Sequence, residues 1–149
     1  MIKTLKTIIL ASALVAPMAI SAQAAEFVIN MKNKGADGTA MVFEPNFVRA
    51  AVGDTVKFVP VDKGHFVQSL PNLWPAGVGE AKGEMNQELV VKLEKDGLYS
   101  FKCAPHYAMG MVALVQVGNA PVTDEVKAIN FPGPVGKRMA DALAMAAKP

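Results

Sequence analysis

The sequence predicts an all-β protein of the sandwich type that ends in short helices. Three observations predict it. Short runs rich in Val, Phe and Ile follow one another between residues 26 and 117, turn signals separate these runs, and helix-forming patterns occur only after Gly118. Strands at this spacing with no helix between them are typical of antiparallel sandwiches and barrels.

Consecutive β-type runs and the turns between them account for most of the chain. The runs cover residues 26–32, 40–45, 46–52, 55–61, 65–70, 87–93, 98–103 and 111–117. Asn33-Lys34-Gly35, Gly53-Asp54 and Asp96-Gly97 supply residues that favour turns, and Pro45 marks a bend or a sheet edge. Residues 71–85 contain several prolines and glycines, so we expect a long irregular loop there.

The C-terminal segment carries helix signals instead. Thr123 is a suitable N-cap for a helix within residues 121–129, because acidic residues follow it in the first turn. Residues 134–147 are good helix formers, with apolar candidates for the buried face at Met139, Leu143 and Met145. We expect two short helices packed on the sandwich.

The N-terminus has the pattern of a secretory signal peptide. Lys3 and Lys6 precede the apolar stretch Thr7–Ile20, which is shorter than the ~20 residues that a membrane-spanning helix needs. The stretch Ala22-Gln23-Ala24 fits a cleavage site. We therefore expect a signal peptide over residues 1–24, cleaved after Ala24 or one residue later, and a single domain over residues 25–149.

The charge balance of that domain limits its partners. The chain has 15 Lys and Arg and 13 Asp and Glu. Without Lys3 and Lys6 the two counts are equal, so the exported domain has zero formal charge. This balance argues against nucleic-acid binding, and any electrostatic function depends on where the charges lie. We expect a monomer that does not insert into membranes after cleavage.

The single cysteine is the strongest functional signal. Cys103 cannot form a disulfide within the chain, so it is an inert buried residue, an intermolecular cross-link or a ligand. His106, Met109 and Met111 follow within eight residues, and the only other histidine, His65, begins an upstream run. Cys103 ends one expected strand and Met111 opens the next. The loop between them can therefore meet His65 at one end of the sandwich.

Copper suits this donor set best. A thiolate and two imidazoles with a weak, long thioether contact form the blue-copper arrangement, whereas structural zinc sites prefer several thiolates. Four protein donors leave no open position, which favours electron transfer over catalysis. The alternatives are an inert buried cysteine and methionines that fill core gaps. Spacing does not decide between Met109 and Met111, because residues two apart are equivalent under strand alternation.

Several stretches together resemble the cupredoxins and, among them, the pseudoazurins. They are NKG (33–35), MVFEPNFVRA (41–50), GDTVKFVPVDKGH (53–65), GLYSFKCAPHYAMGMVALVQVG (97–118) and the helical tail. The resemblance spans nearly all of residues 25–149. It implies a cupredoxin-like Greek-key β-sandwich with two C-terminal α-helices. It also implies one type 1 copper bound by His65, Cys103, His106 and Met111, in a one-electron shuttle of the bacterial periplasm.

One position departs from this family. Asparagine commonly follows the first ligand histidine and ties the two ligand loops together, whereas Phe66 stands there in this chain. A phenyl ring cannot make those hydrogen bonds, although the Phe66 backbone N–H can still point at the Cys103 sulfur. Phe66 either excludes water from the site, which would change the reduction potential of the metal, or simply packs in the sandwich core.

The resemblance also implies a docking surface at the copper end. Its expected partners are redox proteins such as copper or haem nitrite reductases and cytochromes c. The expected docking residues are the lysines Lys34, Lys63, Lys82 and Lys102 and the apolar Pro105 and Met109. Most such lysines are merely solvated turn residues. On a domain of zero net charge, however, a lysine ring would make one pole positive and would steer an acidic partner.

Other functions remain as alternatives. The main one is a periplasmic copper carrier or storage protein, which would favour an exposed site that exchanges metal readily. A secreted binding module with an inert cysteine would show no metal-dependent colour. We expect no enzymatic activity, because the sequence shows no nucleophile–base pair, phosphate-binding loop or second metal cluster.

Overall fold

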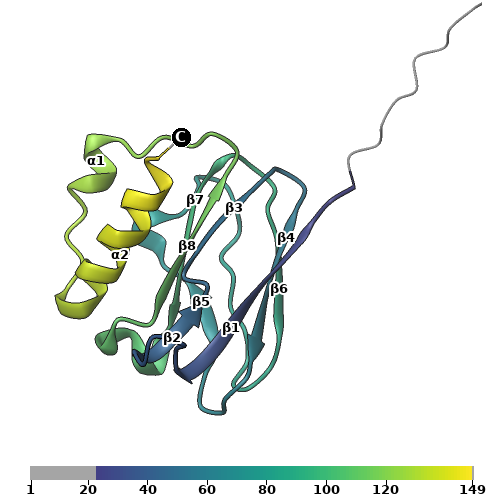
Figure 1. The fold of residues 1–149 in the computed structure, drawn as a ribbon. Coiled ribbons are helices and arrows are strands. Elements are labelled where there is room, and N and C mark those ends of the chain that lie inside the picture. Colours follow the sequence, from purple (N-terminus) through teal and green to yellow (C-terminus); the bar gives the residue numbers. More distant parts are fainter. Residues whose placement is uncertain (1–22, 149) are drawn as a thin grey trace, which may run out of the picture.

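Two four-stranded sheets face each other in the computed structural model, which describes residues 23–148. Their strand orders are β2-β1-β4-β6 and β3-β8-β7-β5 (Figure 1). The strands are β1 (Glu26–Lys34), β2 (Ala40–Glu44), β3 (Phe47–Ala50), β4 (Thr55–Pro60), β5 (Val67–Ser69), β6 (Leu89–Lys92), β7 (Gly97–Cys103) and β8 (Val112–Val117). The predicted β-sandwich is confirmed. The predicted signal peptide, residues 1–24, lies outside the described residues except for its last two positions.

Two of the strand pairs are parallel, so the sheets are mixed, whereas the spacing of the runs is typical of antiparallel sandwiches and barrels. β1 pairs in parallel with β4, and β3 with β8. Both pairs join strands that are not consecutive in the chain. β2 forms an antiparallel hairpin with β1, and the chain then crosses at Pro45 and Asn46 into the other sheet as β3. When the chain returns to the first sheet as β4 it runs in the direction of β1, so these two strands pair in parallel.

Alternate residues of the facing strands fill the space between the sheets. Ile29 and Met31 of β1 are fully buried, as are Tyr99, Phe101 and Cys103 of β7. This period of two follows from the strand pleat, which sends every second side chain to the same face. The sulfur-bearing residue Cys103 therefore lies in the same layer as the core aromatics.

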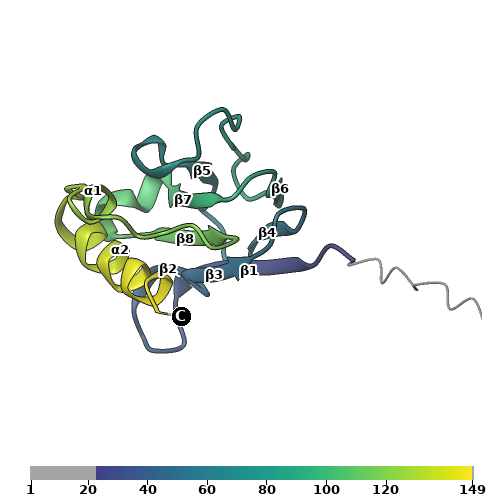
Figure 2. The same ribbon diagram turned by 90° about the horizontal axis from the view of Figure 1, so that it is seen from above.

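Two helices cover the other face of the sheet that contains β8. They are α1 (Asp124–Lys127) and α2 (Gly133–Ala146), and both lie on the β8 side of the sandwich in Figures 1 and 2. Every residue of β8 is buried as a result. Thr123 accepts a hydrogen bond from the Val126 N–H, which confirms the predicted N-cap. None of the helices within residues 23–148 has the length and apolar character that crossing a bilayer requires.

The buried face of α2 follows the helical repeat. Its buried residues are Val135, Met139, Ala142, Leu143 and Ala146. These positions recur every three or four residues and form one stripe along the helix. Met139 and Leu143 occupy the predicted positions. Met145 is only partly buried, because its neighbour Ala146 takes the inward position.

Short 3-10 turns interrupt both of the expected loops. Pro71–Leu73 forms one turn in the long loop, and an isolated antiparallel bridge joins Gln68 to Lys82. Residues Ala104–Met109 form a second 3-10 segment with a kink at His106. β5 starts at Val67 rather than at the predicted residue 65. His65 and Phe66 therefore belong to the connection that precedes it.

Candidate metal centre

Two neighbouring strands bring the predicted ligands together at one end of the sandwich. β5 and β7 are antiparallel, with Val67 opposite Cys103. His65, two residues before Val67, therefore reaches the place where β7 ends. His106 lies in the 3-10 segment after β7, and Met111 directly precedes β8. The register of β5 on β7 thus brings His65 beside Cys103, although the two residues are 38 positions apart in the sequence.

The three strong donors converge on one point. The Cys103 Sγ lies 3.6 Å from the His65 Nδ1 and 3.5 Å from the His106 Nδ1. The two Nδ1 atoms are 3.1 Å apart, and all three donor atoms lie within 4.8 Å of one another. His65 and Cys103 are fully buried, and His106 is half-buried. Two imidazoles and one thiol thus face a common space with only one imidazole edge toward solvent.

Met111, rather than Met109, belongs to this buried cluster. Met111 is 0% exposed, whereas the side chain of Met109 is 45% exposed. The Met111 carbonyl accepts a hydrogen bond from the Cys103 N–H at 3.0 Å, and the Met111 N–H donates to the His106 carbonyl at 3.3 Å. Strand alternation treats the two methionines alike, but the chain between them is not a strand. The 3-10 segment and the left-handed Gly110 turn Met109 outward and Met111 inward.

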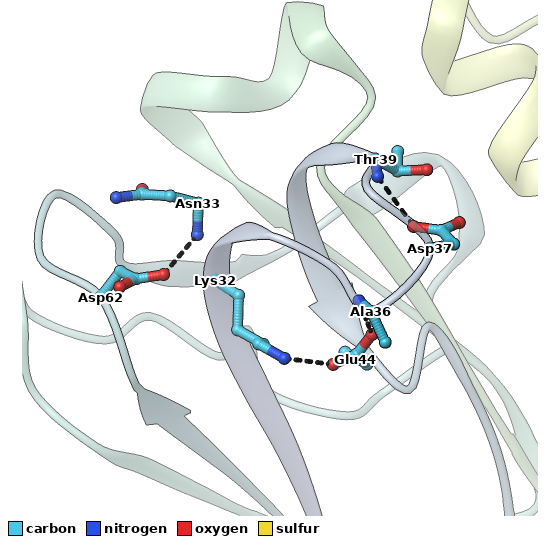
Figure 3. Close-up of polar contacts among 7 residues, drawn as sticks. All are labelled: Lys32, Asn33, Ala36, Asp37, Thr39, Glu44 and Asp62. Carbon is cyan, nitrogen blue, oxygen red and sulfur yellow. Dashed lines mark hydrogen bonds and ion pairs between the residues drawn. The ribbon is translucent and has the colours of Figure 1, made fainter.

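Asn33 holds His65 from the far side of the ring. The His65 Nε2 lies 2.9 Å from the Asn33 Oδ1. When this nitrogen carries the proton, Nδ1 is left free to bind a metal. Asn33 is itself anchored, because its backbone N–H donates to the Asp62 Oδ2 at 2.7 Å (Figure 3). Asn33 was not predicted as part of the site, because only the pairing of β1 with β4 brings its turn beside the His65 connection.

Polar contacts also fix the hairpin that carries Asn33. Lys32 pairs with Glu44 across β1 and β2, and the same carboxylate accepts from the Ala36 N–H at 2.9 Å (Figure 3). Within the turn, the Thr39 N–H donates to the Asp37 Oδ1 at 2.8 Å. Backbone donors satisfied in this way hold a turn in one shape. Asn33 therefore faces His65 from a hairpin with a defined conformation.

Asn86 is a second residue that sequence reasoning missed. Its Oδ1 accepts from the Gly64 N–H at 2.6 Å, and its own N–H donates to the His65 carbonyl at 2.8 Å. Asn86 has a φ of 60°, a left-handed conformation that asparagine tolerates better than most residues. The long loop before β6 therefore holds the backbone on both sides of the Gly64–His65 peptide. A single asparagine in a polar loop gives no signal of this role in the sequence.

Phe66 lies at the edge of the site rather than in the core. Its side chain is partly exposed and belongs to neither hydrophobic core cluster of residues 23–148. Ordinary packing in the sandwich core, one of its two expected roles, is therefore excluded. The backbone N–H of Phe66 acts to lower the pKa of the Cys103 thiol, which agrees with a hydrogen bond to the sulfur.

Burial controls the protonation of the donors. Desolvation raises the pKa of the Cys103 thiol, while the backbone N–H groups of Phe66 and His106 act in the opposite direction. Desolvation also lowers the pKa of His65, with help from the neighbouring His106 and against a smaller effect of Asp62. A neutral imidazole is the form that binds a metal. A buried thiolate needs a positive charge beside it, which a bound cation supplies.

The donors fit copper. A single thiol rules out the thiolate-rich sites of structural zinc, and two imidazoles with a buried thioether nearby match the soft and borderline preferences of copper in its two oxidation states. His65, Cys103, His106 and Met111 are thus arranged as a type 1 copper site.

The predicted docking residues lie around this end of the molecule. Lys34, Lys63 and Lys82 are exposed, and Lys102 is half-buried with its Nζ 5.4 Å from the centre of the Tyr107 ring. Lys82 and Lys102 lie on either side of Gln68, because Gln68 pairs with both residues. Within residues 23–148 the ion pairs use other lysines, namely Lys32, Lys57, Lys127 and Lys137. Lys34, Lys63, Lys82 and Lys102 therefore keep their charge available.

Two predicted apolar residues and one further methionine are exposed. Pro105 and Met109 are exposed, as expected. Met85 is 46% exposed and precedes Asn86, which bonds to the His65 connection. Sequence reasoning did not include Met85, since it lies in the long loop with no motif around it.

Comparisons with known proteins agree with this geometry. Residues 29–118 match the family model described as copper binding proteins, plastocyanin/azurin family. The chain is 45% identical to a pseudoazurin of Paracoccus pantotrophus over 138 residues, which cover 91% of this chain and 94% of the relative. It is 50% identical to a pseudoazurin of Methylorubrum extorquens over 100 residues, or 67% of each chain.

Solved structures give the same answer. The native pseudoazurin of Hyphomicrobium denitrificans superimposes with a TM-score of 0.77 at 48% identity, covering 80% of this chain and 97% of that one. The pseudoazurin of Methylobacterium extorquens gives a TM-score of 0.75 at 43% identity, covering 80% and 98%. The relatives just described, which match most of the chain, are pseudoazurins, and the chain belongs to the plastocyanin/azurin family of copper-binding proteins.

Proposed function

We propose that this protein is a periplasmic one-electron shuttle without enzymatic activity, which exchanges electrons with copper or haem nitrite reductases and cytochromes c. Membership of a family of blue-copper electron carriers supports the electron-carrier part. The observation that carries the proposal is the convergence of the His65, Cys103 and His106 donor atoms within 4.8 Å, with Met111 buried beside them. A closed set of four donors serves a redox metal that does not bind substrate.

The chain prepares the site so that little has to move during electron transfer. Bound copper supplies the one-electron change between Cu(I) and Cu(II). His65 is held at Nε2 by Asn33 and at its backbone by Asn86, and Cys103 is held by its backbone bond to Met111. Donors that are fixed before the metal binds keep the reorganisation energy small. His106, half-buried between the exposed Pro105 and Met109, provides the route for electrons to the surface.

The expected colour tests the copper site directly. The purified protein loaded with Cu(II) should show an intense visible band near ~600 nm, because a single thiolate donates charge to Cu(II) in this arrangement. The Cys103→Ala variant should stay colourless. A folded, copper-loaded wild-type protein without this band would remove the proposal.

Copper carriage or storage is the alternative that the burial of the donors disfavours. Copper release to a strong chelator separates the two functions. A buried His65–Cys103 pair predicts slow release, over hours, whereas a carrier site would release its metal within seconds. Fast release would favour the carrier.

The four lysines support docking to an acidic partner. Encounter between opposite charges is steered at low salt and weakens as the screening length falls to about 8 Å at ~0.15 M salt. Changing Lys63 and Lys102 to Glu should slow association with a nitrite reductase about tenfold or more at low salt. Turnover at saturating partner should stay the same, because the copper ligands are untouched.

A matched control uses exposed lysines at the opposite end. Lys92 pairs with Thr55, at the end of β4 far from His65, and Lys148 follows α2. Neither forms an ion pair within residues 23–148. The Lys92→Glu, Lys148→Glu variant has the same net charge as the test variant. Equal rates for the two variants, or rates that do not respond to salt, would exclude steered docking.

Export and cleavage after Ala24 are part of the same proposal. The Ala25 backbone nitrogen lies 2.8 Å from the Oδ1 of the buried Asp54. Cleavage after Ala24 would place the new α-ammonium group at this carboxylate, whereas cleavage one residue later would remove the contact. The mass of the protein isolated from the periplasm distinguishes the two products, and a product that keeps residues 1–24 would contradict both.

A further inference from the structure

Arg138 of α2 reaches the loop that carries the ligands. Its Nη1 donates to the Gly110 carbonyl at 2.9 Å and to the Met41 carbonyl at 2.6 Å, and its Nη2 donates to the Ala40 carbonyl at 2.8 Å. One guanidinium thus joins three parts of the fold that are distant in sequence: α2, the start of β2 and the residue before Met111. Hydrogen bonds from a charged donor are stronger than neutral ones.

The first turn of α2 also packs directly against Gly110. Gly110 is buried and has a φ of 86°. A Cβ at this position would lie 3.0 Å from the Pro134 carbonyl oxygen and 3.1 Å from the Arg138 Nε. Glycine allows both the left-handed turn and this close approach. The helix and the loop are therefore in contact through backbone atoms as well as through the Arg138 side chain.

These contacts fix the peptide group that leads into Met111. The carbonyl of the Gly110–Met111 peptide accepts from Arg138, and its N–H donates to the His106 carbonyl at 3.3 Å. On the next peptide, the Met111 carbonyl accepts from the Cys103 N–H at 3.0 Å. Met111 is thus tied to His106 and Cys103 on the inner side of the loop. Arg138 supplies the contact on the outer side.

From this arrangement we infer that Arg138 is a positioning residue for Met111, whose thioether would bind the copper, so that α2 is part of the framework of the copper site. The inference rests on the proposed function, since it takes Met111 as a copper ligand. Without Arg138 the Gly110 carbonyl loses its charged donor and keeps only the bond from the Val112 N–H at 2.9 Å, so the Gly110–Met111 peptide is held less firmly. The thioether then samples a wider range of positions relative to the Cys103 sulfur and the two imidazoles.

The metal-free protein tests the framework without reference to copper. In Arg138→Ala, amide hydrogen exchange at Met111 should be about tenfold or more faster than in the wild type, because a charge-assisted hydrogen bond to the same peptide is lost. Arg138→Lys should be intermediate, since an ammonium group can bond to one carbonyl but lacks the planar fork. Lys137→Ala is the control, because Lys137 is exposed on the same helix and its one ion pair within residues 23–148 is with Asp141.

The copper-loaded protein tests the effect on the ligand. Arg138→Ala should change the relative intensities of the visible copper bands and release copper to a chelator about tenfold faster, while Lys137→Ala should match the wild type. A mere loss of helix anchoring would lower the stability but leave the spectrum and the potential of the folded protein unchanged. Equal Met111 exchange in the alanine variants at positions 137 and 138, or an unchanged spectrum in folded Arg138→Ala, would overturn the inference.

Failure of the inference about Arg138 can be distinguished from failure of the proposed function. If Arg138→Ala does not fold, Arg138→Lys carries the same comparison, and the inference then fails if its Met111 exchange and spectrum equal those of Lys137→Ala. A wild-type protein that binds no copper would refute the proposed function. In that case the exchange arm would still report whether Arg138 holds the Gly110–Met111 peptide.

Discussion

Replacing Asn33 by alanine should weaken both the fold and the copper site. The side chain of Asn33 accepts from the His65 Nε2 at 2.9 Å, and His65 is 0% exposed. Leaving such a buried donor without a partner costs about 1–3 kcal/mol. Asn33 itself lies at the surface, so water can partly replace its oxygen. The expected loss in the free energy of unfolding is therefore about 1–2 kcal/mol, in the lower part of that range.

Thermal unfolding of the metal-free protein measures this loss. The domain that follows Ala24 has 125 residues (149 − 24), which corresponds to an unfolding entropy of about 0.26 kcal/mol/K. A loss of 1–2 kcal/mol then lowers the Tm by about 4–8 °C. Copper affinity should fall by about 5- to 30-fold on the same energies, because the His65 ring loses the contact that orients it. A chelator competition measures that affinity.

Asn72→Ala is the control for this prediction. Asn72 is exposed in the 3-10 turn Pro71–Leu73, and its side chain makes no hydrogen bond within residues 23–148. Its variant should keep the wild-type Tm and copper affinity. If Asn33→Ala behaves like Asn72→Ala in both assays, the reasoning about the orientation of His65 is refuted.

Three further predictions follow from the site and its surroundings. Met111→Gln should keep copper but lower its reduction potential, because a harder oxygen donor favours Cu(II). Met109→Gln should leave the visible spectrum unchanged, because Met109 is exposed. A spectrum that changes in Met109→Gln but not in Met111→Gln would make Met109 the thioether ligand. Phe66→Asn should shift the potential by adding a polar group beside the ligands, and voltammetry that finds the wild-type value would limit Phe66 to a surface role. Backbone N–H groups, first that of Ala51, hold the pKa of Asp54 below its ordinary value of 3.8. The stabilisation from Asp54 is therefore present above pH 3.8 and is lost as the pH falls below it. In unfolding experiments the difference in stability between the wild type and Asp54→Asn should shrink as the pH is lowered. A difference that grows in acid would contradict this.

The strands and the ligand set could be predicted because their signals are local. Alternation along a strand, as in Tyr99, Phe101 and Cys103, depends only on the pleat of that strand. The spacing of Cys103, His106 and Met111 places three donors in one short loop whatever the rest of the chain does. His65 required one further step, namely that its run lies beside that loop, and the resemblance to the cupredoxins supplied it.

The parallel strand pairs could not be predicted in the same way. Alternation states which side chains share a face but not which strand lies alongside. The pairs β1–β4 and β3–β8 depend on the crossing of the chain between sheets at Pro45 and Asn46. The same limitation concealed Asn33, whose role appears only when β1 lies beside β4.

The sequence by itself determined the chemistry of this protein, because residue types and short spacings decide which donors are available. The donor set of one cysteine, two histidines and nearby methionines suits copper and excludes a thiolate-rich zinc site. Because the charges balance, any electrostatic steering must come from local clusters of charged residues. The spacing of the residues left Met109 and Met111 equivalent and only the resemblance favoured Met111, whereas the tertiary structure shows why Met111 turns inward and what holds each ligand. Met111 is selected by the left-handed Gly110, and the contacts of Asn33, Asn86 and Arg138 join segments far apart in the chain. Hydrogen bonds between distant segments depend on how whole sheets and helices pack, and a linear pattern does not contain that information.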